Sequence, residues 1–238
     1  MNLNELKIKT VYDLGYDKYE GRDQKDNSKS SGKTTVYFKD IKNHLIRHIN
    51  QAESILGCVA WLTDFDILDA MVNKQVQLIV QKEDFLRPDC GVNKSGYKKA
   101  LQSKYNALKC DLNKWAMLDH ICCHDENYNY VSSIESVRCV GNHNSNNQPS
   151  HPRMHNKFVL FCDLPQNIQN ESPEPYAVWT GSFNFSRNAG NSFENALYIT
   201  DKDIVGAYFK EYQQITMFSE SLNWSSNWVK PEIMRWKD

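Results

Sequence analysis

The chain has 238 residues, of which 40% are hydrophobic and 24% are charged, and its formal net charge at pH 7 is −1. This composition excludes fibrous and wholly disordered proteins, and the length suffices for one large domain or two small ones. A near-neutral net charge does not by itself indicate a nucleic-acid partner, so any phosphate-binding surface has to be local.

The apolar runs and the cysteines indicate the cellular compartment. The longest apolar run, Ile55–Leu62, falls far short of the roughly 20 residues that span a bilayer. The first 13 residues lack the apolar core of a secretory signal. Seven irregularly spaced cysteines fit buried thiols in a reducing compartment. The sequence therefore predicts a cytoplasmic protein without a membrane anchor.

Three parts are expected along the chain. Residues 1–33 form an amino-terminal lead-in that ends in a polar, charged loop over Tyr19–Lys33. The main domain is predicted over residues 34–222, with a variable insertion at about 84–150, and a tryptophan-rich extension over 223–238 follows.

The first half of the main domain alternates between strand and helix patterns. Strands are predicted over Thr34–Phe38, Ile55–Leu62 and Val76–Val80, which are apolar and rich in β-branched residues. Between them lie two segments with helical spacing of apolar residues, which Asp40 and Asp64 are placed to cap. The apolar positions are Ile41, Leu45, Ile49 and Ala52 in the first helix and Phe65, Leu68, Met71 and Val72 in the second. This alternation predicts an α/β sheet.

The second half continues with one further helix, three strands and a closing helix. The looser segment 84–136 contains one apolar stripe at helical spacing. Strands are predicted over Lys157–Phe161, Tyr176–Thr180 and Leu197–Thr200, with a long surface turn over 165–175. The helical stripes consist of Leu101, Tyr105, Leu108 and Leu112, and of Ile204, Tyr208, Tyr212 and Ile215.

Polar groups with chemical potential gather at the ends of two of these strands. His155, Asn156 and Lys157 open one strand, the segment GSFNFS at 181–186 leaves the next, and NSFEN at 191–195 follows. Strand ends are where an α/β sheet commonly builds its site. Because side chains alternate along a strand, His155 and Lys157 are expected on one face, where both can meet a single phosphate.

Each of these residue types has a part in phosphoryl chemistry. The imidazole of His155 can attack phosphorus, and the Lys157 ammonium can hold the phosphate oxygens. The hydroxyl of Ser182 and the amide of Asn184 supply further donors to anionic oxygens. Glu194 can orient the histidine and fix its tautomer.

These segments together resemble the phospholipase D superfamily, whose motif H-x-K-x4-D precedes a G-S-x-N turn. The resemblance spans roughly residues 34–220 and implies an α/β/α sandwich with a mixed central sheet and one motif per chain. The acidic position of the motif holds Cys162 here, and Asp163 follows one residue later. We expect Asp163 and Asn195 to give structural support rather than to contact phosphate.

The resemblance also implies a mechanism and a substrate class. The family forms a covalent phosphohistidine with one histidine while a second protonates the leaving oxygen, and it needs no metal or cofactor. Because this sequence has one H-x-K, the resemblance implies a homodimer with a composite site. The expected activity is an endonuclease acting on DNA, with RNA possible. A phospholipase or cardiolipin-type hydrolase and an inactive, dimeric nucleic-acid-binding module are the alternatives.

Three other clusters have weaker functional interpretations. A potential zinc set matches no familiar ligand spacing, so core or surface positions are favoured for it. It consists of Cys110, His120, Cys122, Cys123 and His124. Lysines over 98–114 can follow a nucleic-acid backbone, but a solvated helix face is favoured. Trp224, Trp228 and Trp236 indicate packing or a dimer interface more than base stacking.

Overall fold

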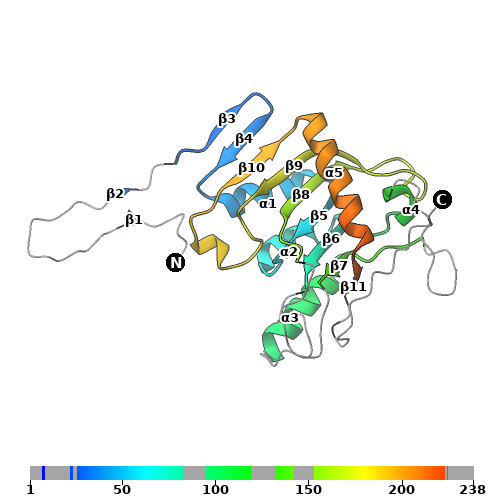
Figure 1. The fold of residues 1–238 in the computed structure, drawn as a ribbon. Coiled ribbons are helices and arrows are strands. Elements are labelled where there is room, and N and C mark those ends of the chain that lie inside the picture. The colour runs from blue at the N-terminus through cyan, green and yellow to red at the C-terminus, as the bar shows by residue number, and fades with distance from the viewer. Residues whose placement is uncertain are drawn as a thin grey trace, which may run out of the picture.

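The computed structural model describes residues 7–8, 22–23, 26–82, 95–118, 132–141, 153–222 and 224. Within these ranges, nine strands form one sheet in the order β11-β7-β6-β5-β8-β9-β10-β4-β3 (Figure 1). The strands are β3 Lys29–Ser31, β4 Thr34–Tyr37, β5 Ser54–Val59, β6 Gln75–Gln81, β7 Val137–Val140, β8 Lys157–Asp163, β9 Glu174–Gly181, β10 Ala196–Ile199 and β11 Glu220–Ser221. β1 (Lys7–Ile8) and β2 (Arg22–Asp23) pair separately.

The sheet is mixed, as expected. β5, β6 and β7 run parallel to one another, whereas β8 lies antiparallel to β5 and begins an antiparallel half that continues through β9, β10, β4 and β3. β8 is therefore the central strand. Gly57 explains part of the close β5–β8 approach, because a Cβ there would lie 2.4 Å from the Phe158 carbonyl oxygen.

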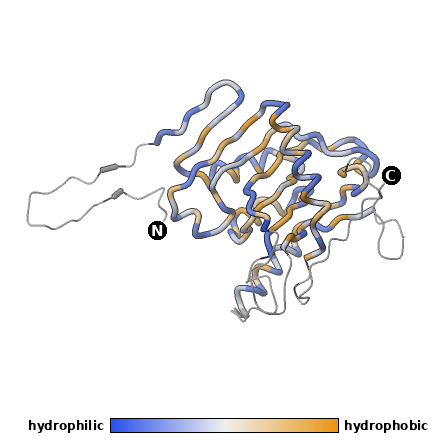
Figure 2. The backbone as a smooth tube through the Cα atoms, viewed as in Figure 1, coloured by the Kyte–Doolittle hydropathy of each residue, from blue (hydrophilic) through white to orange (hydrophobic). Residues whose placement is uncertain are grey.

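Helices cover both faces of the sheet, which gives the expected α/β/α sandwich. The helices are α1 Ile41–Gln51, α2 Phe65–Met71, α3 Ser95–Asn106, α4 Lys114–Met117 and α5 Lys202–Met217, with a short 3-10 helix, η3, over Ala189–Asn191. One buried cluster joins α1, α2 and α3 to the sheet, and a second joins α4 and α5 to the other face (Figure 1). Figure 2 shows apolar residues concentrated along the central strands between these layers.

Two of the helix starts are set by aspartate caps. Asp64 Oδ1 accepts hydrogen bonds from the amides of Asp66 and Ile67 at the start of α2, and Asp201 caps α5 in the same way. The predicted capping by Asp40 is wrong. Asp40 does precede α1, but its backbone is left-handed, with φ 53°, and its carboxylate accepts from Asn43 Nδ2 instead of a helix amide.

Other segments depart from the predicted elements. The helix in the 84–136 segment ends at Asn106, because Leu108 and Leu112 pack in the two different clusters and so lie on opposite faces of the sheet. β7 was not predicted. Lys29–Ser31, predicted to be loop, pairs as an exposed edge strand with β4. β5 ends at Val59 rather than at Leu62.

Two observations concern membrane-spanning helices and cysteines. None of the helices in the described ranges has the length and apolar character required to cross a membrane. Among the described cysteines, Cys58, Cys139 and Cys162 are buried free thiols and Cys110 is a partly buried one, which agrees with the expected buried thiols.

Candidate functional site

The sheet register brings the predicted segments together at one end. Lys157 pairs with Val59 of β5, and the pairing of Phe158 with Thr180 brings Lys157 level with Gly181 of β9. Gly181 in turn pairs with Ala196 of β10. One row of residues therefore crosses four strands. We call the region just beyond this row, with residues 60–62, 153–156, 182–186 and 191–195, the site end of the sheet.

His155 and Lys157 meet at the site end, although the strand begins only at Lys157. Lys157 Nζ donates to the His155 carbonyl oxygen at 3.0 Å and lies 3.1 Å from the same residue's Nδ1. The imidazole is exposed, and the ammonium is partly buried. A nucleophilic ring and a cation therefore lie side by side, open to a ligand.

The electrostatics of Lys157 reflect its position. Partial burial lowers the pKa of the Lys157 ammonium, because removing it from water disfavours its charged form. The negative charge of Glu194 opposes this shift and favours the ammonium. The Glu194 carboxylate therefore interacts electrostatically with the Lys157 ammonium.

Ser182, Glu194 and Asn195 form a hydrogen-bonded cluster between β9 and β10. The Ser182 hydroxyl donates to the Glu194 carboxylate and accepts from the Asn195 amide N at 3.1 Å and from Asn195 Nδ2 at 3.4 Å. The Ser182 amide donates to the Asn195 carbonyl oxygen at 3.1 Å. In this geometry, the Ser182 proton positions the carboxylate, and its predicted contact with phosphate stays a prediction.

Gly181 makes this cluster possible. Its φ is 154°, and a Cβ there would lie 2.3 Å from the Asn195 carbonyl oxygen. Only glycine lets the two strands approach this closely at that position without displacing Asn195.

The turn after Gly181 is tied to the start of α2. The amides of Thr63 and Asp64 both donate to the Phe185 carbonyl oxygen, at 2.7 and 2.9 Å. Within the turn, Asn184 Oδ1 is buried without a hydrogen-bond partner among the described residues. This oxygen is an acceptor, so donation from the Asn184 amide to a phosphate stays a prediction.

The structure places the remaining predicted residues as follows. Among the described side chains, Glu194 bonds to Ser182, and Lys157 rather than Glu194 lies at His155 Nδ1, so orientation of the histidine by Glu194 stays a prediction. Asp163 is exposed at the far end of β8, and Cys162 beside it is buried. Burial raises the pKa of the Cys162 thiol, so it packs as a neutral group.

Sequence reasoning missed Trp61 at the site end. The rings of Trp61 and His155 are perpendicular, at 89°, with centroids 6.3 Å apart. The predicted strand Ile55–Leu62 concealed Trp61, because an aromatic residue inside an apolar run is read as core. The actual end of β5 at Val59 leaves it outside the strand, with 39% of its surface exposed.

The weaker clusters gain little support. Of the potential zinc set, residues 120–124 lie outside the described residues, and within the described ranges no three His, Cys, Asp or Glu side chains are placed to hold a metal ion. Lys104 pairs with Asp69, and Lys114 is buried, so the lysines do not form one continuous basic face. Trp224 packs against Tyr105 at 5.6 Å, whereas Trp228 and Trp236 lie outside the described residues.

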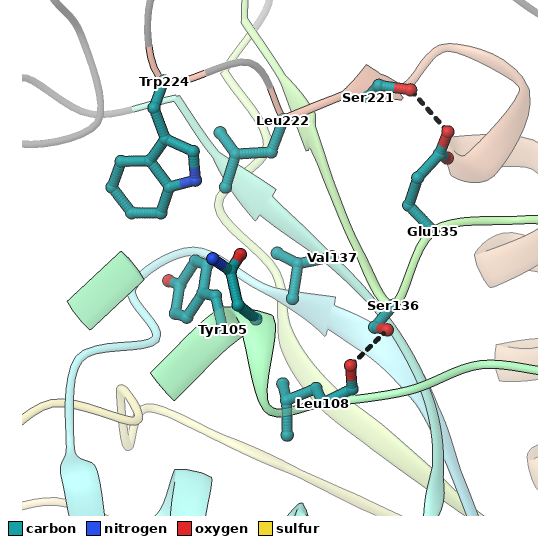
Figure 3. A pocket seen from close by; sticks show the side chains of 9 residues that line it. Tyr105, Leu108, Glu135, Ser136, Val137, Ser221, Leu222 and Trp224 are labelled. Atoms are coloured by element: carbon teal, nitrogen blue, oxygen red, sulfur yellow. Dashed lines mark hydrogen bonds between the residues drawn. The ribbon is translucent and has the colours of Figure 1, made fainter. Parts of the chain in front are cut away.

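A separate pocket of about 300 Å³ lies at the start of β7 (Figure 3). Ser221 donates to Glu135 across its rim, and Ser136 donates to the Leu108 carbonyl oxygen. The lining residues are Tyr105, Asn106, Leu108, Glu135, Ser136, Val137, Ser221, Leu222 and Trp224. None of them belongs to the site end, which adjoins the ends of β5 and β6 instead.

Comparison with known sequences defines the class of protein. The family described as cardiolipin synthase, PLD-like domain matches residues 45–216, which include all of the motifs above. An uncharacterised protein of Acanthamoeba polyphaga mimivirus is 35% identical over 207 residues, covering 80% of this chain and 67% of that protein. The chain therefore belongs to the phospholipase D-like family.

Two solved structures are similar in fold. The phospholipase D family member Nuc from Salmonella typhimurium is 16% identical, with a TM-score of 0.48, and the match covers 79% of this chain and 95% of that one. NucT from Helicobacter pylori is 18% identical, with a TM-score of 0.46, over 79% of this chain and 98% of that one.

Proposed function

We propose that the protein is a metal-independent phosphodiesterase that hydrolyses nucleic acid through a covalent phosphohistidine. The observation that carries the proposal is the meeting of His155 and Lys157 at the same sheet end as the Ser182–Glu194–Asn195 cluster. Membership of the phospholipase D-like family supports this chemistry.

In the first step, His155 Nε2 attacks phosphorus, and the bond from phosphorus to the leaving oxygen breaks. This attack needs the ring proton on Nδ1, so Lys157 turns its ammonium from Nδ1 to the phosphate oxygens when substrate binds. The ammonium and the Asn184 amide then offset the charge that develops on phosphorus. In the second step, water attacks the phosphohistidine, releasing the phosphate product and restoring the free imidazole.

A second histidine has to protonate the leaving oxygen and later deprotonate the water. The sequence contains a single H-x-K, so we assign this role to His155 of the partner subunit in a two-fold dimer. Two exposed imidazoles facing one phosphate would form the composite site.

The polar surroundings of the histidine favour nucleic acid over lipid. Exposed guanidinium groups precede and follow the catalytic segments, at Arg153 and Arg187, and Asn156, Ser182 and Asn195 are exposed beside them. Exposed cations at a phosphodiester site suit a polyanionic chain with further phosphates on either side. We favour DNA, with RNA as the second substrate.

The test is cleavage of single- and double-stranded DNA and RNA in excess EDTA by the wild type and by His155→Ala. We expect cleavage that survives EDTA and is lost in the variant. Acid-quenched wild-type reactions should trap labelled phosphate on His155, found by mass spectrometry.

Lys210→Ala, at an exposed position of α5 outside the site end, serves as the folded control. The nuclease proposal fails if the folded wild type cuts no nucleic acid. Hydrolysis of phosphatidylglycerol or cardiolipin vesicles would then indicate a lipid enzyme, and tight nucleic-acid binding without cleavage would indicate a binding module. A wild type that is active only as a monomer would overturn the shared site.

A further inference from the structure

The inference starts from the exposed indole beside the nucleophile. Trp61 is 39% exposed, and its ring stands perpendicular to that of His155 at 6.3 Å. The backbones are tied as well, because the Ala60 amide donates to the Asn156 carbonyl oxygen at 2.8 Å. Trp61 follows Ala60 and His155 precedes Asn156, so this hydrogen bond holds the indole beside the imidazole.

The core does not account for this position. The residues on either side of Trp61, Ala60 and Leu62, are completely buried and fill the space under the end of β5. Leaving a large aromatic ring in water among polar neighbours forgoes the free energy that its burial would provide. A ring kept there next to a nucleophile is suited to contact a ligand.

We propose that Trp61 stacks on a nucleobase next to the cleaved phosphate and makes single-stranded nucleic acid the preferred substrate. This inference rests on the proposed function and adds a determinant of substrate class. A base and its phosphate are joined through one sugar, so a ring in contact with the attacking imidazole is within reach of that base. Aromatic stacking accepts every base, because each has a π-face.

The preference for single strands follows from access to that face. In a duplex, both faces of an internal base are covered by its neighbours, and exposing one requires unstacking. In a single strand, the base is free to leave its neighbours and lie on the indole. Trp61 therefore favours the single strand over the duplex of the same sequence.

Other groups at or next to the site end fit the same ligand. Phe193 precedes Glu194 and is 66% exposed, which provides a second ring beside the catalytic segments. Arg153 and Arg187 add exposed guanidinium groups. Exposed rings interleaved with cations are typical of surfaces that bind single strands, where bases stack and phosphates pair with charge.

The test compares kcat/KM for a single-stranded oligonucleotide and its duplex, using wild type, Trp61→Ala and Trp61→Phe. Phe218→Ala is the matched control, because Phe218 is 59% exposed and lies at the end of α5, outside the site end. A third substrate has the same backbone but carries tetrahydrofuran residues without bases on both sides of the cleaved phosphate.

We expect wild type to prefer the single strand. Trp61→Ala should lower kcat/KM for it about tenfold, mainly through a higher KM, as expected for the loss of one stacked base. Trp61→Phe should recover most of this loss, and Phe218→Ala should have no effect. On the baseless substrate, wild type and Trp61→Ala should be equal.

Each contrary outcome has a distinct meaning. Equal losses in Trp61→Ala on both single-stranded substrates would overturn stacking, since Trp61 would then only position His155. If the wild type cuts nucleic acid and Trp61→Ala cuts it equally well, this inference alone is overturned. The same holds if the only defect of Trp61→Ala is weaker binding to anionic lipid vesicles. A folded wild type that cuts no nucleic acid would overturn the proposed function together with it.

Discussion

The site end and the β7–β11 side of the sheet use charged residues in opposite ways. Arg138 in β7 is completely buried, and its guanidinium donates to Ser219 Oγ at 2.7 Å, to the Ser219 carbonyl oxygen at 2.9 Å and to Glu135 at 2.5 Å. At the site end, His155 and Ser182 are exposed. The buried charge is surrounded by hydrogen-bond partners from the chain, whereas the residues proposed to receive a ligand are exposed.

Two lysines show the same contrast. The Lys82 side chain is 0% exposed and pairs with Glu220 at 3.3 Å, so a carboxylate compensates the buried charge. Lys157 instead lies beside the His155 ring, and partial burial lowers the pKa of the Lys157 ammonium. The first lysine is paired with a charge of its own chain, and the second is the one we propose to meet the charge of a substrate.

His155→Ala should give the largest effect, a loss of activity with little change in stability. We expect a loss of at least about 1,000-fold in kcat/KM, or about 4 kcal/mol of transition-state stabilisation, because the nucleophile is gone. The free energy of unfolding should change by less than about 0.5 kcal/mol, because the side chain is exposed. Urea unfolding and cleavage kinetics check both; strong destabilisation would break the comparison.

Arg138→Met tests the other region. Removing the guanidinium leaves the buried Ser219 hydroxyl and carbonyl oxygens without this donor, so the free energy of unfolding should fall by about 3 kcal/mol. The kcat of the folded fraction should be unchanged. Exposed Arg153→Met is the matched control and should cost less than about 0.5 kcal/mol. If Arg138→Met is as stable as the wild type, a buried and fully hydrogen-bonded charge does not stabilise this fold, and the comparison fails.

Gly181→Ala should affect both the stability of the fold and the geometry of the site. The added Cβ would clash with the Asn195 carbonyl oxygen at 2.3 Å, so we expect a cost of about 2 kcal/mol in stability and a lower kcat from the displaced cluster. Gly190→Ala is the control, because nothing lies within 4 Å of its added Cβ. Thermal unfolding and kinetics of both variants provide the measurement, and equal behaviour would contradict the close approach.

The smallest expected effect is that of His48 on the pH dependence of stability. Burial, with the nearby charges of Arg47 and His44, lowers the pKa of His48 to about 4 from its ordinary 6.5. Between these values the unfolded chain binds a proton that the folded one excludes, so stability present above pH 6.5 is lost as pH falls toward 4. We expect a loss of about 1 kcal/mol. His48→Gln should flatten this part of the pH–stability curve; an unchanged slope would rule His48 out.

Periodicity made much of the fold predictable. The strands and helices from β4 to β6 and from β8 to α5 follow apolar patterns that packing then enforces. β7 was not predicted because Arg138 interrupts its short apolar run. The burial of that arginine depends on Ser219, which lies 81 residues away in the sequence. Likewise, the polar segment Lys29–Ser31 becomes a strand only by pairing with β4.

The candidate site was predictable in membership but not in contacts. Motif spacing pointed to His155 and Lys157, and the register brings Lys157 level with Gly181 with His155 beside it. The partner of Ser182, the far position of Asp163 and the proximity of Trp61 to His155 depend on where strands end. Strand ends are set by tertiary pairing, which a local pattern does not encode.

The central place of β8 has a consequence for how the protein opens. Neighbours on both sides protect its amides, so they should exchange with deuterium only through large-scale unfolding, whereas β3 and β11 exchange by fraying at the margins. His155, the proposed nucleophile, precedes the strand that should open last. Partial melting of the margins should therefore leave the reaction centre assembled.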